Sequence, residues 1–147
     1  MRRVPLIAAL LAAVGCVGDG PPTVRYGREE CARCRMIVND DRFAAAAVTA
    51  AGEAHKFDEV GCLIDYLADH PDAARLWVRG YRSGTWLDAK QAYFAYGPKL
   101  QTPMGAGLAA AATREEADAL AAEWGGRVLR FDELAEFLKK QAQAGSP

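Results

Sequence analysis

The sequence predicts an α+β fold of two small related ββα-type units, and three observations support this prediction. The length of 147 residues allows one compact domain or two very small ones. Hydrophobic residues make up 51% and charged residues 25% of the chain, which excludes an intrinsically disordered protein.

The third observation is an internal repeat. Residues 52–63 read GEAHKFDEVGCL and residues 126–137 read GRVLRFDELAEF. Both segments predict a short strand, an Asp that caps a helix, and an amphipathic helix. Two generic capped helices would explain part of this similarity, but the shared glycine and strand favour a duplication. We therefore expect one unit at about residues 26–80 and a second at about residues 81–140.

Turn signals and hydrophobic periodicity predict the elements of both units. The Ala run at 44–47 competes with the first strand, because Ala favours helix by propensity. In the first unit we expect a strand near 43–50, a turn at Ala51-Gly52, a strand near 53–57, a helix from Asp58 to about Asp69 and a strand at 76–81. In the second we expect a short turn or helix at 86–92, a strand at 93–96, a loop at 97–108, a helix at 113–124 ended by Gly125-Gly126, a strand at 127–131 and a helix from Asp132 to about Lys140.

The N-terminus has the pattern of an export signal. Met1-Arg2-Arg3 is followed by an apolar run from Val4 to Val14, and Ala13-Val14-Gly15-Cys16 resembles a bacterial lipobox. We expect residues 1–15 to be a lipoprotein signal peptide, Cys16 to carry lipid, and residues 16–25 to form a tether. Residues 141–147 are expected to form a flexible tail. Lipidation would place the domain on a membrane without a membrane span.

Charge narrows the possible partners. The formal net charge is -1, with 18 basic and 19 acidic residues, which excludes a nucleic-acid binder built on a broad basic surface.

The cysteines are the main chemical signal. The chain has four, at positions 16, 31, 34 and 62, so three remain if Cys16 is lipidated. An odd number in an oxidising compartment leaves one thiol without a disulfide partner unless it binds something. Cys31 and Cys34 form a CxxC, which suits a local disulfide, a thioredoxin-type redox pair, or half of a zinc knuckle. No strand precedes it and no second ligand pair follows, so the redox and zinc interpretations are weak.

Met36 sharpens the interpretation of the CxxC. Two thiolates and a thioether within six residues form a cluster of soft donors, and such donors select Cu(I) over hard ions. The alternative is that Met36 fills a gap in the core. Cys62 is interpreted chiefly as a small buried hydrophobe, with a ligand or disulfide role as the alternative. His55, in a predicted strand, is interpreted as a packed or surface residue more readily than as a ligand.

These features together resemble the NosL family of exported copper-binding lipoproteins, which are accessory to nitrous oxide reductase. The resemblance covers most of the chain after the lipobox. It is carried by the lipobox at Cys16, Cys31-x-x-Cys34-x-Met36, F-D-E-V-G-C-L around Cys62, Trp86-Leu87-Asp88-Ala89, Pro103-Met104-Gly105, Gly125-Gly126 and Phe131-Asp132-Glu133.

The resemblance implies a fold related to organomercurial lyase and a function as a periplasmic, lipid-anchored Cu(I) chaperone. The implied partners are an ABC-type membrane complex and nitrous oxide reductase, during assembly of its copper-sulfide centre. Cys31, Cys34 and Met36 match the CxxC-Gly-Met run of the family, and Met104 on the Gly/Pro-rich loop matches its Met-Gly. Arg35 stands where the family usually has Gly, a residue that permits a positive φ, and its cation would lower the pKa of the thiols.

The competing hypothesis is an enzyme. An exported thiol-disulfide oxidoreductase or an organomercurial-lyase-like enzyme could use the same CxxC. A shared fold is poor evidence for shared chemistry, so we expect a metal-binding protein and not an enzyme.

Overall fold

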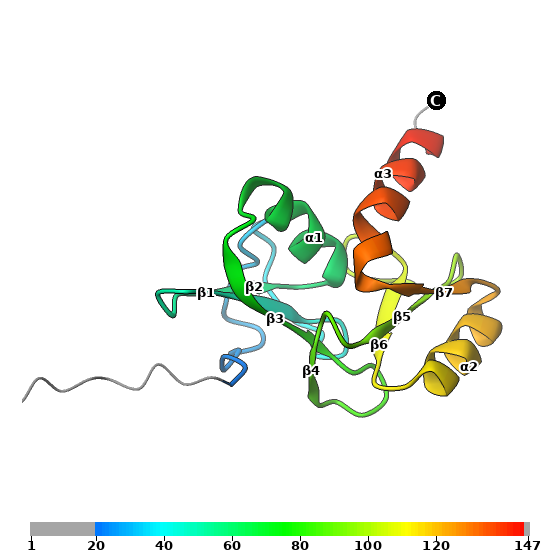
Figure 1. The fold of residues 1–147 in the computed structure, drawn as a ribbon, viewed down its shortest axis with the longest axis horizontal. Helices are drawn as coiled ribbons and strands as arrows, with labels where there is room; N and C mark the ends of the chain where they lie inside the picture. The colour runs from blue at the N-terminus through cyan, green and yellow to red at the C-terminus, as the bar shows by residue number, and fades with distance from the viewer. Residues whose placement is uncertain (1–19, 146–147) are drawn as a thin grey trace, which may run out of the picture.

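The structure is a computed structural model that describes residues 20–145 (Figure 1). The predicted signal peptide, the lipidated Cys16 and the first part of the tether lie outside the described residues. In the part of the chain that is described, no helix is long and apolar enough to cross a membrane.

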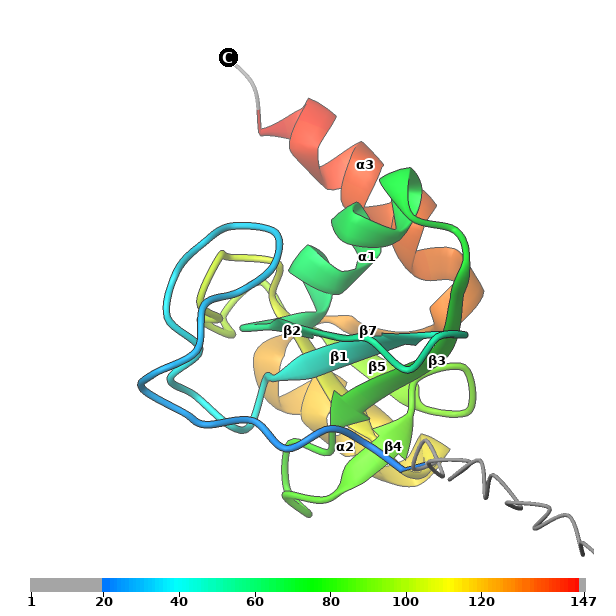
Figure 2. The same ribbon diagram turned by 90° about the vertical axis from the view of Figure 1, so that its left-hand side faces the viewer.

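Two antiparallel sheets form the centre of the molecule, and the α+β prediction is confirmed. The first sheet has the strand order β2-β1-β3-β4 and the second has β6-β5-β7. Helices α1 and α3 lie side by side, whereas α2 packs against β5 and β7 (Figures 1 and 2). The elements are β1 (Ala45–Thr49), β2 (Ala54–Phe57), α1 (Val60–Asp69), β3 (Ala73–Arg79), β4 (Trp86–Asp88), β5 (Tyr93–Tyr96), β6 (Leu108–Ala111), α2 (Arg114–Trp124), β7 (Arg127–Arg130), a 3₁₀ turn (Phe131–Glu133) and α3 (Leu134–Ala144).

The two segments of the internal repeat occupy corresponding places. β2 pairs with the central strand β1 and leads into α1, and β7 pairs with the central strand β5 and leads into α3. β3 and β6 complete the other side of β1 and β5. The sheets meet where Tyr81 N–H donates to the Ala110 carbonyl at 2.8 Å. β4 extends the first sheet beyond residue 80, where the sequence placed the boundary between the units.

Alanine-rich segments form buried strands. All four residues of Ala44–Ala47 have no exposed surface, and β6 is also buried along its whole length. Their small side chains fit a strand that is covered on both faces. The sequence predicted a loop up to residue 108 and a helix from residue 113, and it missed β6 because Ala does not favour strands by itself.

Three further expectations were wrong in detail. Residues 86–88 form strand β4 against β3 instead of a turn or helix. Neither Asp58 nor Asp132 is the N-cap of a helix: Glu59 precedes α1, and Asp132 lies inside the 3₁₀ turn. Helix α3 continues to Ala144, so residues 141–144 of the expected tail are helical. By contrast, Gly125 ends α2 as expected, in the left-handed conformation, and the Thr113 side chain caps the start of this helix.

Candidate metal centre

The CxxC lies in a tight loop that folds back on itself. Cys31 N–H donates to the Met36 carbonyl at 2.7 Å, and Arg35 N–H donates to the Cys31 carbonyl at 3.0 Å. An isolated bridge between Glu30 and Ile37 closes the base of the loop. These bonds bring Cys31 and Cys34 onto one side of the loop, although no regular element contains them.

Arg35 makes this loop possible at a cost. Its φ is 68°, the only positive φ of a non-glycine residue among residues 20–145. A left-handed backbone costs an L-residue about 1–2 kcal/mol, and the glycine usual in the family would avoid that cost. The Arg35 guanidinium forms an ion pair with Glu30. The prediction that its cation lowers the pKa of the thiols fails for Cys34, because burial raises the pKa of that thiol. The pKa of Cys31 is lowered, chiefly by a hydrogen bond from Cys62.

Replacing Arg35 with Gly should therefore give a more stable protein than replacing it with another L-residue. We expect Arg35→Gly to exceed Arg35→Ala in free energy of unfolding by about 0.5–1 kcal/mol, because both variants lose the ion pair but only Gly relieves the backbone. Urea denaturation of the two variants side by side measures this difference. Equal stabilities would show that the left-handed conformation carries no penalty here.

The loop is fastened to the end of β2. Ala32 N–H donates to the Lys56 carbonyl at 2.8 Å. The Lys56 ammonium donates to the Glu29 carboxylate at 2.7 Å, and both side chains are largely buried. These two contacts place the thiols of the loop beside Asp58, which follows β2, and beside the start of α1.

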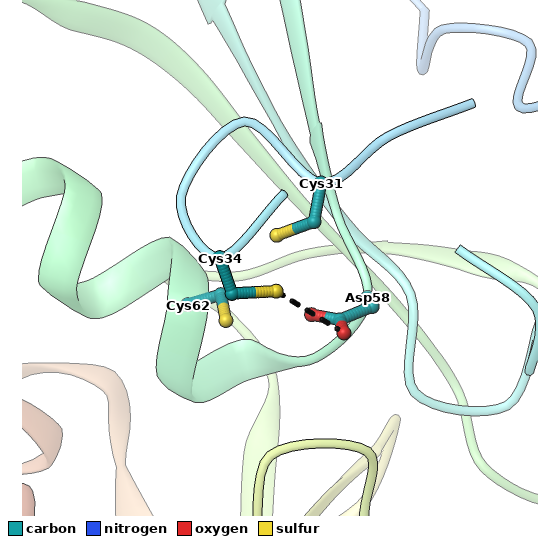
Figure 3. A group of neighbouring side chains, drawn as sticks. All are labelled: Cys31, Cys34, Asp58 and Cys62. Carbon is teal, nitrogen blue, oxygen red and sulfur yellow. Dashed lines mark hydrogen bonds between the residues drawn. The ribbon is translucent and has the colours of Figure 1, made fainter. Parts of the chain in front are cut away.

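Four side chains converge at this point (Figure 3). The thiols of Cys31, Cys34 and Cys62 and a carboxylate oxygen of Asp58 all lie within 4.8 Å of one another. Cys62 comes from the first turn of α1, and Cys34 Sγ donates to Asp58 Oδ2 at 3.4 Å. Cys31, Asp58 and Cys62 are buried and Cys34 is partly exposed. We call this group the thiol cluster.

The thiol cluster has the spacing and chemistry of a metal site. All three cysteines are free thiols, and Asp58 Oδ1 is buried with no hydrogen-bond partner. A buried acceptor without a donor is costly. Thiolate sulfur atoms are soft ligands suited to Cu(I). The three thiols are therefore close enough together, and of the right chemistry, to hold one ion.

The surroundings give the three thiols different pKa values. A hydrogen bond from Cys62 and backbone hydrogen bonds from Cys34, Asp58 and Arg33 lower the pKa of Cys31 to about 6. Burial, together with the neighbouring Cys31 and Asp58, raises the pKa of Cys34 to about 11. The pKa of Cys62 is raised further, mainly because its thiol donates to Cys31. The cluster is therefore prepared to hold one thiolate stabilised by two neutral thiols.

Thiolate absorbance should reveal this asymmetry. In reduced, metal-free protein we expect one thiolate to form with a midpoint near pH 6, and a second only near pH 11. Cys31→Ser should remove the first step, because the other two thiols stay protonated there. A pH titration of the ultraviolet thiolate band measures both proteins. Three thiols titrating together near their ordinary pKa of about 8.5 would contradict the assignment.

A groove opens beside the thiol cluster. Its volume is about 600 Å³, and its lining includes Cys34, Cys62, Glu59, Tyr96, Met104 and Leu138. Met104 comes from the 97–107 loop, which lies near the N-terminus of α1 together with the loop of the CxxC (Figure 2). The Met104 side chain is 51% exposed. The groove therefore connects the partly exposed Cys34 with solvent past an exposed thioether.

The Met36 side chain lies at the surface, and the ring of His55 packs against Tyr66. Met36 is 59% exposed and contributes its backbone to the loop, so the core interpretation does not hold. His55 lies on β2 with its ring 5.1 Å from that of Tyr66 and with Nε2 3.7 Å from Glu53. The ligand roles of both residues stay predictions. Asp58 was missed because an Asp before a helix is also the pattern of an ordinary cap.

Comparisons with known proteins identify the family of this chain. The NosL family model matches residues 24–138. The chain belongs to the NosL family. A curated relative, the copper-binding lipoprotein NosL of Stutzerimonas stutzeri, is 29% identical over 156 residues, covering 92% of this chain and 82% of the relative. The names of the similar proteins describe copper-binding proteins and not enzymes, in agreement with the prediction that this chain is not an enzyme.

A solved structure shares the fold. The copper chaperone NosL from Shewanella denitrificans superposes with a TM-score of 0.62 at 20% identity, covering 77% of this chain and 96% of that protein. The NosL fold predicted from the sequence is thus confirmed.

Proposed function

We propose that this NosL-family protein is a membrane-anchored periplasmic Cu(I) chaperone. Its copper would be delivered for maturation of the copper-sulfide centre of nitrous oxide reductase, through an ABC-type assembly complex or to the reductase itself. The observation that carries the proposal is the convergence of three thiols within 4.8 Å at the end of a groove. The copper-related names of the relatives support the choice of metal.

The thiol cluster explains how the ion would be held. Cys31 provides a thiolate at neutral pH, and Cys34 and Cys62 can join it by releasing their protons when the metal binds. Asp58 is a hard oxygen donor, which Cu(I) does not favour. In the metal-free protein Asp58 instead accepts a hydrogen bond from the Cys34 thiol. Met104 or a group from the acceptor would complete the coordination from the groove, with Met36 as the remaining candidate.

The difference in exposure explains how the ion would leave. Cys31 and Cys62 are buried, whereas Cys34 is partly exposed where it lines the groove. An incoming thiolate, thioether or imidazole can approach along the groove and bind before Cys34 is displaced. Sites with two or three sulfur ligands permit such an exchange, because their coordination shell is open.

Native mass spectrometry of anaerobically reduced protein tests the copper function. We expect one Cu(I) per chain and its transfer to copper-free nitrous oxide reductase when the two are mixed. Failure to take up Cu(I) would overturn the proposal. Uptake without transfer would leave copper binding but exclude direct delivery to the reductase. Turnover of a disulfide substrate by the metal-free protein would favour the enzyme hypothesis instead.

A further inference from the structure

A second buried carboxylate lies beside the thiol cluster and does not face it. Glu59 is 2% exposed. Its Oε2 accepts from Met104 N–H at 3.0 Å and its Oε1 accepts from Ala106 N–H at 3.3 Å. Both oxygens are therefore engaged by the backbone of one loop. A carboxylate is buried at a high cost unless donors satisfy it, so this loop and Glu59 stabilise each other.

The neighbouring Asp58 faces the other way. The Asp58 carboxylate accepts a hydrogen bond from the Cys34 thiol. Glu59 follows it in an extended backbone, and its carboxylate accepts hydrogen bonds from the 97–107 loop. Successive side chains of an extended chain point to opposite sides. The Asp58-Glu59 pair thus joins the thiol cluster to the loop that carries Met104.

The internal repeat shows that Glu59 has departed from the ordinary use of this position. Glu59 aligns with Glu133 in the repeat. Glu133 is exposed and accepts from Arg130 N–H at 2.6 Å, three residues away, as a capping box does. Glu59 forms no such local cap and reaches 45 residues along the chain to Met104 instead. Helix formation alone does not require this contact.

Close packing at Gly61 supports the same interpretation. A Cβ on Gly61 would lie 2.8 Å from both Ala106 Cβ and Glu59 Oε1. Residue 61 must therefore be Gly for the loop to approach α1 this closely. The 97–107 loop thus packs on the start of α1 because the buried Glu59 carboxylate binds its backbone and because Gly61 has no side chain in the way.

We propose that Glu59 is a positioning residue that holds the Met104 loop over the thiol cluster. The role rests on the proposed copper function, since it fixes where the Met104 thioether stands when Cu(I) enters or leaves the groove. Met104 lines the same groove as Cys34 and Cys62. Without Glu59, the loop would lose two backbone hydrogen bonds and Met104 would move away from this position.

A double-mutant cycle tests the role of Glu59. Cu(I) affinity is measured by bathocuproine competition for the wild type, Glu59→Gln, Met104→Leu and the double variant. We expect each single variant to weaken binding about 10-fold to 100-fold, the range seen for residues that orient ligands. The double variant should be no weaker than Met104→Leu, because Glu59 acts through Met104. Additive losses, or a Glu59→Gln variant with wild-type affinity, would overturn the proposal.

Hydrogen exchange gives a readout that does not depend on copper. In metal-free protein, Glu59→Gln should raise the exchange rates of the Met104 and Ala106 amides, while amides of β1 stay protected. Gly61→Ala should also raise the exchange rates of these two amides, although it keeps the Glu59 carboxylate. This variant replaces Glu59→Gln in the test if Glu59→Gln is poorly folded. Glu115→Gln, at an exposed site on α2, is the matched control and should change neither measurement. Unchanged exchange in both variants would refute positioning by Glu59, whereas wild-type protein that takes up no Cu(I) would refute only the copper function.

Discussion

Replacing both Cys31 and Cys34 with Ser should lower the Cu(I) affinity of the protein by at least about 100-fold. Removing a direct ligand should cost no less than the 10-fold to 100-fold loss seen when a residue that only orients a ligand is changed. The double variant would leave Cys62 as the one thiol of the cluster, with Asp58 beside it. A single soft donor and a carboxylate are a poor site for Cu(I). Competition with bathocuproine under anaerobic, reducing conditions measures the loss.

The loop that carries the thiols offers a matched control. Arg33→Ser with Arg35→Ser introduces the same two side chains into the same loop and leaves all three thiols in place. We expect this control to keep Cu(I) affinity within a few-fold of the wild type. Circular dichroism of both double variants checks that the fold persists, because Cys31 is fully buried. If Cys31→Ser/Cys34→Ser kept full affinity, the thiol cluster would not be the copper site.

Cys62→Ser separates two forms of the site. If Cu(I) is held by all three thiols, this single variant should also weaken binding by about 10-fold or more. If Cys31 and Cys34 alone hold the ion, the loss should stay within a few-fold. The same competition measurement distinguishes the two forms.

Replacing Gly126 with Ala should destabilise the fold strongly, with an expected loss of about 3 kcal/mol or more in the free energy of unfolding. A Cβ on Gly126 would lie 1.7 Å from the carbonyl oxygen of Tyr96 and 2.6 Å from its carbonyl carbon. Both are backbone atoms of β5, the central strand of the second sheet, and cannot turn aside as a side chain could. Overpacking commonly costs about 1–3 kcal/mol, and a clash with backbone lies at or above the upper end.

Two other glycines provide graded controls for Gly126→Ala. Gly125 has a φ of 70° but open space around its Cβ position, so Gly125→Ala should cost about 1 kcal/mol through backbone strain alone. Gly20 has neither constraint, and Gly20→Ala should be neutral. Urea denaturation of the three variants should give this order. A Gly126→Ala variant as stable as Gly125→Ala would mean that β5 and β7 separate easily.

The strands show where sequence patterns succeed and where they stop. The hairpin of β1 and β2 and the strands β3, β5 and β7 were expected from short apolar runs between turn signals, and helices α1, α2 and α3 from their periodicity. β6 was missed because its sequence, Leu108–Ala111, has no β-branched or aromatic residue. Its strand conformation comes from pairing with β5 and burial on both faces, which are properties of the assembled sheet.

The site was predicted to different degrees from residue to residue. Cys31 and Cys34 are close in the sequence, so their proximity was evident at once. Cys62 could be interpreted equally well as a core residue, because burial and metal binding both favour a small apolar thiol. The structure shows it buried and within the thiol cluster at the same time. Glu59 had no distinguishing signal beyond its place in the repeat.

The sequence by itself determined the local chemistry of this protein: a soft-donor CxxC, two helix-starting Phe-Asp-Glu segments, and glycines where the chain turns or packs tightly. Such features depend on residues that are close along the chain. Only the tertiary structure decided that Cys62 and Asp58 join Cys31 and Cys34, and that Glu59 holds the loop of Met104. Those contacts join residues 24 to 45 positions apart. They exist because the pairing of β2 with β1 and the seating of α1 bring distant segments together, which no local pattern encodes.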